Sequence, residues 1–376
     1  MRRLPFNRPL RTGAEAARLE EALDRGWTGG NGPTSEHCQA LLRDLTGSHL
    51  VLLTHSCTGA LEMCALLAGV GPGDEVIMPS FTFASTANAF VLRGATPVFV
   101  DVEADTLNID PQRVAAAITP RTRVIVAVHY GGVGCDMAAL GTLASEHDLL
   151  LVEDAAQGVG ATLHGRPLGA IGDLGTLSFH ETKNISCGEG GALLVNAERL
   201  AGRAEILQEK GTDRQRFARG EVDHYTWVDI GSSFVLSDLA AALLADQLER
   251  VEQITAARRE IWDAYHAAFE PLERAGALRR PVVPAGAEHN AHLYRLMLPD
   301  RAARDAVIAA LAADGISAYF HYVPLHSAPA GRRFGRSHGP MDVTDAAAQT
   351  LVRMPLWVGI SDDDVARVAQ GVAAAT

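Results

Sequence analysis

Cysteines are few in this sequence, and they form no recognisable pattern. The 376 residues include five cysteines, an odd number with irregular spacing and no Cys-X-X-Cys pair. Such a set predicts neither a disulfide framework nor a zinc knuckle, and it fits a reducing compartment. The histidines His55, His129 and His180 also lack the spacing of metal ligands, so we expect no metal site. The five cysteines are Cys38, Cys57, Cys64, Cys135 and Cys187.

Long apolar runs and an excess of basic residues are also missing. No run approaches the ~18 residues of a membrane span, and the N-terminal MRRLPFNRPL lacks the apolar stretch of a signal peptide. The formal net charge is −12 at pH 7, which argues against a protein that wraps nucleic acid. We therefore expect a cytoplasmic protein without a membrane or nucleic-acid partner. A small anionic substrate is still compatible, because backbone N–H groups can bind phosphate on an acidic protein.

The sequence does contain a regular alternation of apolar runs and helical patterns between Leu50 and about Leu200. Apolar runs that are hydrophobic throughout, separated by helical patterns, indicate a mostly parallel sheet covered by helices on both faces. We therefore predict an α/β fold. The predicted strands cover 50–54, 75–80, 97–102, 123–130, 149–156, 175–180 and 191–195, and the helices between them start near Thr58 or cover 83–94, 111–118 and 136–147.

The pattern changes after Gly231. Residues 236–269, rich in alanine and leucine, predict one helix that is long enough to bridge two domains. The segments 292–298 and 316–324, with helices over 301–314 and 362–374, predict a smaller α+β domain. We expect a large domain over residues 1–245, including an N-terminal arm, and a small domain over residues 246–376.

Three segments carry candidate chemistry. Asp154 in VEDAAQ ends a buried strand, where open α/β sheets place functional groups, although it could simply cap the next turn. THSCTGALEM begins a helix near Thr58, and a helix start binds anions, although a Ser/Thr N-cap is the commoner meaning. Neither a Walker A loop nor a GxGxxG fingerprint occurs.

The third segment is LSFHETKNI, in which Lys183 follows a predicted strand. Most lysines are solvated surface groups. Here, Ser178 precedes the lysine by five residues, and the glycines of CGEGG (187–191) allow the backbone to pass close to a bulky group. A phosphate cup, an acid for a ring nitrogen and an amine are together what pyridoxal phosphate (PLP) needs from a protein.

Seven motifs together make a specific resemblance that covers essentially the whole chain. They resemble the DegT/StrS family of PLP-dependent sugar aminotransferases, and most closely the branch that acts on dTDP-4-keto-6-deoxyglucose. The resemblance implies the PLP-dependent transferase fold type I, a nucleotide-sugar substrate, an amino-acid donor and a homodimer with shared active sites. The motifs are VEDAAQ, SFHETKN, GEGG, GDEVIMPSFTF, RGATPVFVDV, DIGSSF and HYVPLH.

The resemblance also implies roles for individual residues. Lys183 would bind the cofactor covalently and then move protons as a general base and acid. Asp154 would pair with the ring nitrogen, and Gln157 would hydrogen-bond the ring hydroxyl. Phe83 would stack on the ring, or it would only fill the core.

The cofactor phosphate would be held by Thr58, Gly59 and Ser178. Many relatives add an asparagine from the neighbouring subunit. The corresponding residue is Ser233 here, a shorter donor, so that contact is lost or mediated by water.

Substrate contacts are expected in the segment 318–326, which otherwise would be an aromatic-rich strand of the small domain. The candidates there are Tyr319, His321, Tyr322 and His326. Three arginines could meet a diphosphate, although a solvated surface position is commoner for any one of them. They are Arg214, Arg216 and Arg219.

The predicted function is transfer of the amino group of L-glutamate to C4 of dTDP-4-keto-6-deoxy-D-glucose, giving 2-oxoglutarate and a dTDP-4-amino-4,6-dideoxyhexose of galacto or gluco configuration. A dehydratase of the same family is the first alternative, but such relatives carry histidine where this chain has Lys183. A non-catalytic regulatory protein is the second, although it would not need Lys183 and Asp154 together. A nicotinamide-dependent dehydrogenase would need the missing glycine fingerprint.

Overall fold

A computed structural model describes residues 3–376, and its centre is an eight-stranded sheet of order β1-β9-β8-β5-β4-β2-β3-β12. Of these strands, only β9 runs against the others, pairing antiparallel with both β1 and β8, and the remaining pairs are parallel. The predicted α/β class is therefore confirmed. The strands are β1 (Leu50–Thr54), β2 (Glu75–Pro79), β3 (Thr96–Val100), β4 (Thr122–Val128), β5 (Leu150–Asp154), β8 (Leu174–Ser178), β9 (Gly191–Val195) and β12 (Arg336–Ser337).

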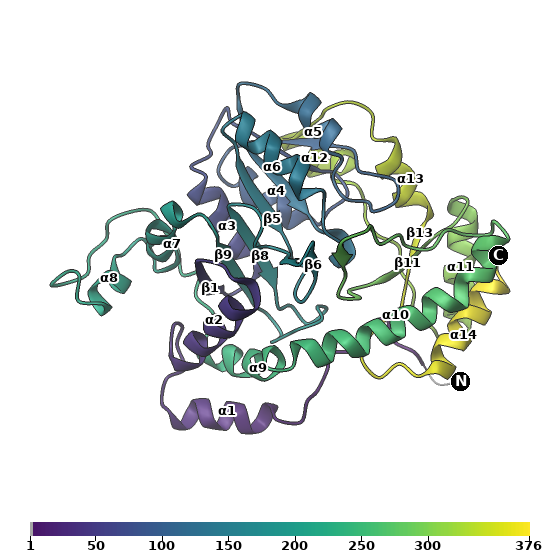
Figure 1. The fold of residues 1–376 in the computed structure, drawn as a ribbon, viewed down its shortest axis with the longest axis horizontal. Helices are drawn as coiled ribbons and strands as arrows, with labels where there is room; N and C mark the ends of the chain where they lie inside the picture. The colour runs from purple at the N-terminus through teal and green to yellow at the C-terminus, as the bar shows by residue number, and fades with distance from the viewer. Residues whose placement is uncertain (1–2) are drawn as a thin grey trace.

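Helices cover both faces of the sheet because successive side chains of a strand point to opposite faces. Val76 and Met78 of β2 pack with α3 and α4, whereas Ile77 between them packs with α5 and α6. At the other end of the sheet, α2 and α9 cover β1, β8 and β9 (Figure 1). The helices are α1 (Glu15–Asp24), α2 (Pro33–Thr46), α3 (Cys57–Leu67), α4 (Ala84–Val91), α5 (Pro111–Ala117), α6 (Met137–Glu146), α7 (Ala201–Gln208) and α9 (Asp238–Leu248).

A second hydrophobic core lies beyond the sheet. The long helix α10 (Val251–Arg274) leads from α9 to it (Figure 1), and β11 (Tyr294–Met297) pairs antiparallel with β13 (Leu351–Met354). Tyr265 of α10 and Tyr294 of β11 are fully buried there, and Leu4 near the N-terminus joins the same core. The remaining helices are α8 (Arg214–Ala218), α11 (Arg301–Ala313), α12 (Pro329–Phe334), α13 (Asp342–Thr350) and α14 (Asp362–Ala373), and the short strands are β6 (Thr162–Leu163), β7 (Arg166–Pro167) and β10 (Ala287–Glu288).

The helix predicted over 236–269 is in fact two helices. It is interrupted at Glu249 and Arg250, between α9 and α10, and neither residue is a glycine or a proline that would mark the break in the sequence. The expected domain boundary at residue 245 falls inside α9 and stays a prediction. No helix within residues 3–376 is both long and apolar enough to cross a membrane.

Candidate active site

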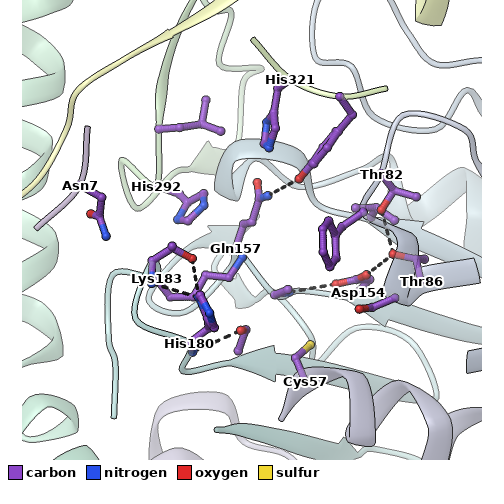
Figure 2. Close-up of a pocket in the computed structure, with 18 of the residues that line it drawn as sticks. Asn7, Cys57, Thr82, Thr86, Asp154, Gln157, His180, Lys183, His292 and His321 are labelled. Carbon is purple, nitrogen blue, oxygen red and sulfur yellow. Dashed lines mark hydrogen bonds between the residues drawn. The ribbon is translucent and has the colours of Figure 1, made fainter. Parts of the chain in front are cut away.

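A pocket of about 510 Å³ lies between the sheet and the second core. The carboxyl ends of β5 and β8 and the first turns of α3 and α4 form one side of it, and β13 with the segment around His321 forms the other. Figure 2 shows Asp154 with Thr86 on one flank, Lys183 with His180 on the other, and Gln157 between them. The place is the one that open α/β sheets use for ligands.

Asp154 is the last residue of β5 and is 6% exposed. Its Oδ2 accepts a hydrogen bond of 2.7 Å from the hydroxyl of Thr86, and its Oδ1 accepts one of 3.2 Å from the N–H of Ala156. Within residues 3–376, no cationic side chain forms an ion pair with it. A buried carboxylate without a cationic partner is costly, so this side chain fits a ligand that carries positive charge.

Lys183 lies in the loop that joins β8 to β9. The loop closes on itself because the N–H of Phe179 donates to Gly190 O at 2.8 Å and the N–H of Cys187 donates to Phe179 O at 3.0 Å. Gly191, at the end of this loop, must be glycine, since a Cβ there would lie 2.4 Å from the backbone nitrogen of Cys57. The glycine-rich segment therefore lets the lysine loop pass directly against the start of α3.

The amine of Lys183 is tuned towards its neutral form. Burial lowers the pKa of Lys183 and the cation of Arg353 lowers it further, against the opposing effects of Cys57 and Asp154. No hydrogen bond from this amine to the rest of the described chain is present. A neutral amine is the form that acts as a nucleophile or a general base.

The first turn of α3 faces the same pocket. Cys57 and Thr58 hold its first two positions, whose N–H groups have no partner within a helix, and both line the pocket with Ser178. The Thr58 hydroxyl lies 2.8 Å from that of Ser85. Gly59 does not line the pocket, and its N–H donates to the N-cap side chain of Ser56 at 3.0 Å.

Gln157 and Phe83 also line the pocket, on the side of Asp154 and Lys183, which we call the lower half. Oε1 of Gln157 accepts a hydrogen bond of 2.6 Å from the N–H of Gly131, and its Nε2 donates one of 3.1 Å to the hydroxyl of Tyr322. Phe83 precedes α4 and is 64% exposed. The alternative that Phe83 only fills the core is therefore wrong, and its ring is free to contact a ligand in the pocket.

The opposite side of the pocket, formed by β13 and the segment around His321, is called the upper half. It contains Tyr319, His321 and Tyr322. The hydroxyl of Tyr130 lies 3.0 Å from Nδ1 of His321. Burial raises the pKa of Tyr130 to about 12, so its hydroxyl keeps its proton and can donate to Nδ1. Burial, together with the cations of Arg353 and Lys183, lowers the pKa of His321 to about 2. His321 is therefore neutral, and its proton is on Nε2 where Nδ1 accepts the bond from Tyr130.

Several candidates from the sequence do not line this pocket. His326 lies with its Nδ1 2.7 Å from the hydroxyl of Ser80, and Ser233 is exposed next to the start of α9. Arg216 and Arg219 pair with Glu221 on the projecting segment around α8 (Figure 1). Arg214 starts the same short helix.

The sequence profile of the DegT/DnrJ/EryC1/StrS aminotransferase family matches residues 10–373. The chain belongs to this family. It is 36% identical to the spore coat polysaccharide biosynthesis protein SpsC of Bacillus subtilis, over 98% of this chain and 96% of SpsC. The putative sugar aminotransferase Spr1654 of Streptococcus pneumoniae, in its PLP form, has a TM-score of 0.91 at 28% identity, over 100% of this chain and 98% of that one. DesI, solved in the presence of its TDP-sugar product, has a TM-score of 0.89 at 32% identity, over 100% of this chain and 94% of DesI.

The pocket of this PLP-dependent sugar aminotransferase fits the cofactor of its family. Asp154 would pair with the ring nitrogen, Lys183 offers a free amine, and the first turn of α3 offers unpaired N–H groups to a phosphate. The expected family, fold type I and cofactor are thus confirmed. The role of each residue stays a prediction.

Other residues of this aminotransferase pocket were not anticipated. Thr86 lies in the first turn of α4, and its hydroxyl is 2.8 Å from that of Thr82, which precedes the helix. Phe6 and Asn7 of the N-terminal segment, His292 and Arg353 also line it. No local pattern marks these four, since each reaches the pocket only through long-range folding.

Proposed function

We propose that the protein transfers the amino group of L-glutamate to C4 of dTDP-4-keto-6-deoxy-D-glucose, giving a dTDP-4-amino-4,6-dideoxyhexose and 2-oxoglutarate. The proposal depends on one observation above all. Within the described residues, one pocket holds the amine of Lys183, which makes no hydrogen bond, and the carboxylate of Asp154, which has no ion-pair partner. The similarity to DesI, whose product is a TDP-sugar, supports the nucleotide sugar. The donor follows from the family resemblance.

The residues of the lower half would hold the cofactor. We propose that Thr58 and Ser178 bind its phosphate, that Gln157 binds its ring hydroxyl and that Phe83 stacks on its ring. Bound PLP supplies an electron sink for the carbon that exchanges its amine. Asp154 keeps the ring nitrogen protonated, which this sink requires. Gly59 would act by leaving room at the helix start, because a Cβ there would lie 2.8 Å from Cε1 of His55.

Lys183 would move the protons of both half-reactions. Its lowered pKa favours the neutral amine, which is the form that can take a proton from the Cα of the donor. In the second half-reaction it returns a proton to C4 of the sugar. The same side chain argues against the dehydratase alternative, whose members have histidine at this position.

The residues of the upper half would contact the sugar nucleotide. We propose that Nε2 of His321 donates to an oxygen of the sugar, with Tyr319 and Tyr322 beside it. His326 is hydrogen-bonded to Ser80 outside the pocket, so its position does not support a contact with the sugar nucleotide.

We further propose a cytoplasmic homodimer with shared active sites. The segment around α8 exposes several aromatic side chains that a monomer would leave in water, Trp227 at 78% among them. A surface of this kind is typical of an interface. Ser233 is exposed near this segment, where a second copy of the chain could bring it to a cofactor phosphate.

The test uses protein loaded with PLP, wild type beside Lys183→Ala. The visible spectrum is recorded before and after L-glutamate, and again after dTDP-4-keto-6-deoxyglucose. We expect the cofactor band of the wild type to disappear with the amino acid and to return with the ketosugar, while the variant does neither. NMR of the product then gives the configuration at C4. A wild type that binds PLP but does not respond to any amino donor would exclude the proposal.

A further inference from the structure

Asn184, Asn290 and His292 form a hydrogen-bonded cluster beside Lys183. Nδ2 of Asn184 donates to the carbonyl of Asn290 at 2.8 Å, and Oδ1 of Asn184 lies 3.0 Å from Nδ1 of His292. The N–H of His292 donates to Oδ1 of Asn290 at 3.1 Å. Nδ2 of Asn290 donates to the carbonyl of Gln157 at 2.8 Å, so the cluster joins the lysine loop to the residues that follow β5.

The bonds of Asn184 fix the tautomer of His292. A carbonyl oxygen only accepts hydrogen bonds, so the amide nitrogen of Asn184 faces Asn290 and its amide oxygen faces the imidazole. An amide oxygen is also only an acceptor. Nδ1 of His292 must therefore carry a proton and donate the bond, which leaves Nε2 of the neutral ring with a lone pair.

The surroundings of His292 keep its ring neutral. Burial lowers the pKa of His292 well below the ordinary value of histidine, and the basic groups around the ring lower it further. A second proton on Nε2 is therefore disfavoured, and this nitrogen stays an acceptor. The basic groups are Lys183, Arg258, His321 and Arg353.

The lone pair of His292 is available to the active-site pocket. The ring lines the pocket, and within residues 3–376 its Nε2 has no hydrogen-bond partner. The other two pocket imidazoles differ. Nδ1 of His180 accepts from the N–H of Thr182 at 3.2 Å, and Nδ1 of His321 accepts from Tyr130 as described above, so a neutral ring carries its proton on Nε2 in both. Of the imidazoles that line the pocket in the described chain, only His292 offers it a nitrogen acceptor.

We propose that Nε2 of His292 accepts a hydrogen bond from the amine of Lys183 when this lysine is not bonded to the cofactor. The inference rests on the proposed aminotransferase function, in which Lys183 moves protons. Figure 2 shows His292 on the same flank of the pocket as Lys183, and both also line a narrow cavity next to Asn184 and Asn290. The amine of a lysine is carried on a flexible four-carbon stem, so it can turn towards the ring.

Such a bond would hold the amine without taking its proton. The pKa of His292 is too low for the ring to become protonated, so the proton stays on Lys183. An acceptor favours the charged form of an amine, which offsets part of the effect of burial on Lys183. The lysine could then keep the proton that it takes from one carbon until it returns the proton to another. His292 is a positioning residue in this role.

A hydroxyl of the ketosugar is the other donor that Nε2 of His292 could meet. Lys183 is favoured because its neighbour in the chain, Asn184, holds the imidazole ring directly. The same hydrogen bond therefore fixes the direction of the lone pair and ties it to the backbone that carries the lysine.

The first test measures the pKa of Lys183 in the cofactor-free protein. Lys183 is acylated with acetic anhydride over a range of pH, and mass spectrometry gives the pH at which the rate is half its maximum. His292→Phe keeps a ring but removes the acceptor, so the charged amine loses a hydrogen bond and we expect this midpoint to fall by about one pH unit. His292→Gln restores an acceptor oxygen, and its midpoint should lie between those of His292→Phe and wild type.

His289→Phe is the matched control. His289 belongs to the same segment, and its Nδ1 accepts from the N–H of Ala291 at 3.0 Å, but it does not line the pocket. We expect the midpoint of Lys183 to stay at the wild-type value. Equal shifts in His292→Phe and His289→Phe would reflect a loosened segment and would overturn the inference.

The second test observes the tautomer by NMR of protein with isotope-labelled histidine. Nδ1 of His292 should be protonated and Nε2 unprotonated between about pH 6 and pH 9. Asn184→Leu removes the acceptor of the Nδ1 proton, so part of the population should carry the proton on Nε2. The midpoint of Lys183 should then fall by less than in His292→Phe. Asn184→Leu keeps the imidazole, and it replaces His292→Phe in the first test if that variant fails to fold.

The PLP-loaded protein separates Lys183 from the sugar as the partner of Nε2. We expect His292→Phe to slow both half-reactions, because Lys183 moves protons in both. A loss confined to KM for the ketosugar would assign Nε2 to a sugar hydroxyl and overturn the inference. So would an unchanged midpoint of Lys183 in the variant, or a proton on Nε2 in the wild type. Failure of the proposed function looks different, because the wild type would then not react with an amino acid, whereas the midpoint and the tautomer are measured without a substrate.

Discussion

The hydroxyl of Thr86 donates a hydrogen bond of 2.7 Å to Oδ2 of Asp154. Thr86 belongs to the first turn of α4, so a helix on one face of the sheet fixes a carboxylate at the end of a strand. The N–H of Ala156 engages the other oxygen at 3.2 Å. Together the two bonds hold both oxygens of the carboxylate in place at the end of β5.

Replacing Thr86 by valine removes the hydroxyl but keeps the shape of the side chain. A hydrogen bond to a charged group contributes about 1.5–3 kcal/mol, so we expect the affinity for PLP to fall about 10-fold or more. Absorbance titration of the cofactor-free protein with PLP measures this. Thr82→Val is the control, because Thr82 bonds to Thr86 and not to Asp154, and its effect should stay within about 3-fold. Equal effects of the two substitutions would contradict the role given to Thr86.

The pair of Tyr130 and His321 leads to a second prediction, which concerns pH. Burial, with the cations of Arg353 and Lys183, lowers the pKa of His321 to about 2. Because this pKa is depressed, the ring stays neutral at every pH above it, and His321 does not cause the acid limb of the activity profile. The NMR shifts of its ring should stay constant between about pH 5 and pH 9.

Tyr130→Phe removes the hydroxyl that we propose donates to Nδ1 of His321, 3.0 Å away. The proton of His321 is then no longer confined to Nε2, so we expect kcat/KM for the ketosugar to fall about 5- to 10-fold. The half-reaction with the amino donor should change by less than about 2-fold. A loss of the same size in both half-reactions would mean that Tyr130 supports the whole pocket and not the tautomer of His321.

Much of the sheet could be predicted, because its strands are buried on both faces and are apolar throughout. The predicted strand over 50–54 coincides with β1 (Leu50–Thr54), and that over 191–195 coincides with β9 (Gly191–Val195). The break between α9 and α10 could not be predicted, since neither Glu249 nor Arg250 is a helix-breaking residue. The segment 316–324 has a few strand-like pairings, such as Tyr319 with Arg353, and otherwise forms a loop.

The candidate site divides in the same way. Residues at strand ends and helix starts, such as Asp154 and Thr58, could be found from the local pattern around them. Lys183 could be identified as a candidate only by combining several segments of the sequence. Arg353 and Phe6 could not be found, because they meet only when the N-terminal segment and β13 fold together, 347 positions apart in the chain. A side chain whose role depends on such a contact leaves no local periodicity in the sequence.

Lys183 gives a third prediction, because the chain has only two lysines, Lys183 and Lys210. Burial and the cation of Arg353 lower the pKa of Lys183, so its amine loses its proton at a lower pH in the folded protein than in the unfolded chain. Acylation requires the neutral amine. We expect the rate of labelling of Lys183 in the cofactor-free protein to reach half its maximum at a lower pH than in urea. Mass spectrometry separates the two lysine peptides, and Lys210, which is exposed and paired with Glu209 at 3.1 Å, reports reagent reactivity. Coincident folded and unfolded profiles for Lys183 would contradict the lowered pKa.

Ser233 gives the last prediction, which tests the proposed homodimer. Its side chain is exposed, and the resemblance puts an asparagine of a neighbouring subunit at this position, in contact with the cofactor phosphate. Ser233→Asn lengthens the side chain and restores an amide donor. A hydrogen bond to a charged group can contribute about 1.5 kcal/mol, so we expect the dissociation constant of PLP to fall about 10-fold. Ser232→Asn is the control, because Ser232 is also exposed but is offset by one residue, and it should leave the affinity unchanged. The gain should disappear at protein concentrations at which sedimentation shows a monomer, since the donor would then have no neighbouring site. A gain that persists in the monomer would place Ser233 at its own subunit's phosphate, and no gain in the dimer would exclude the contact.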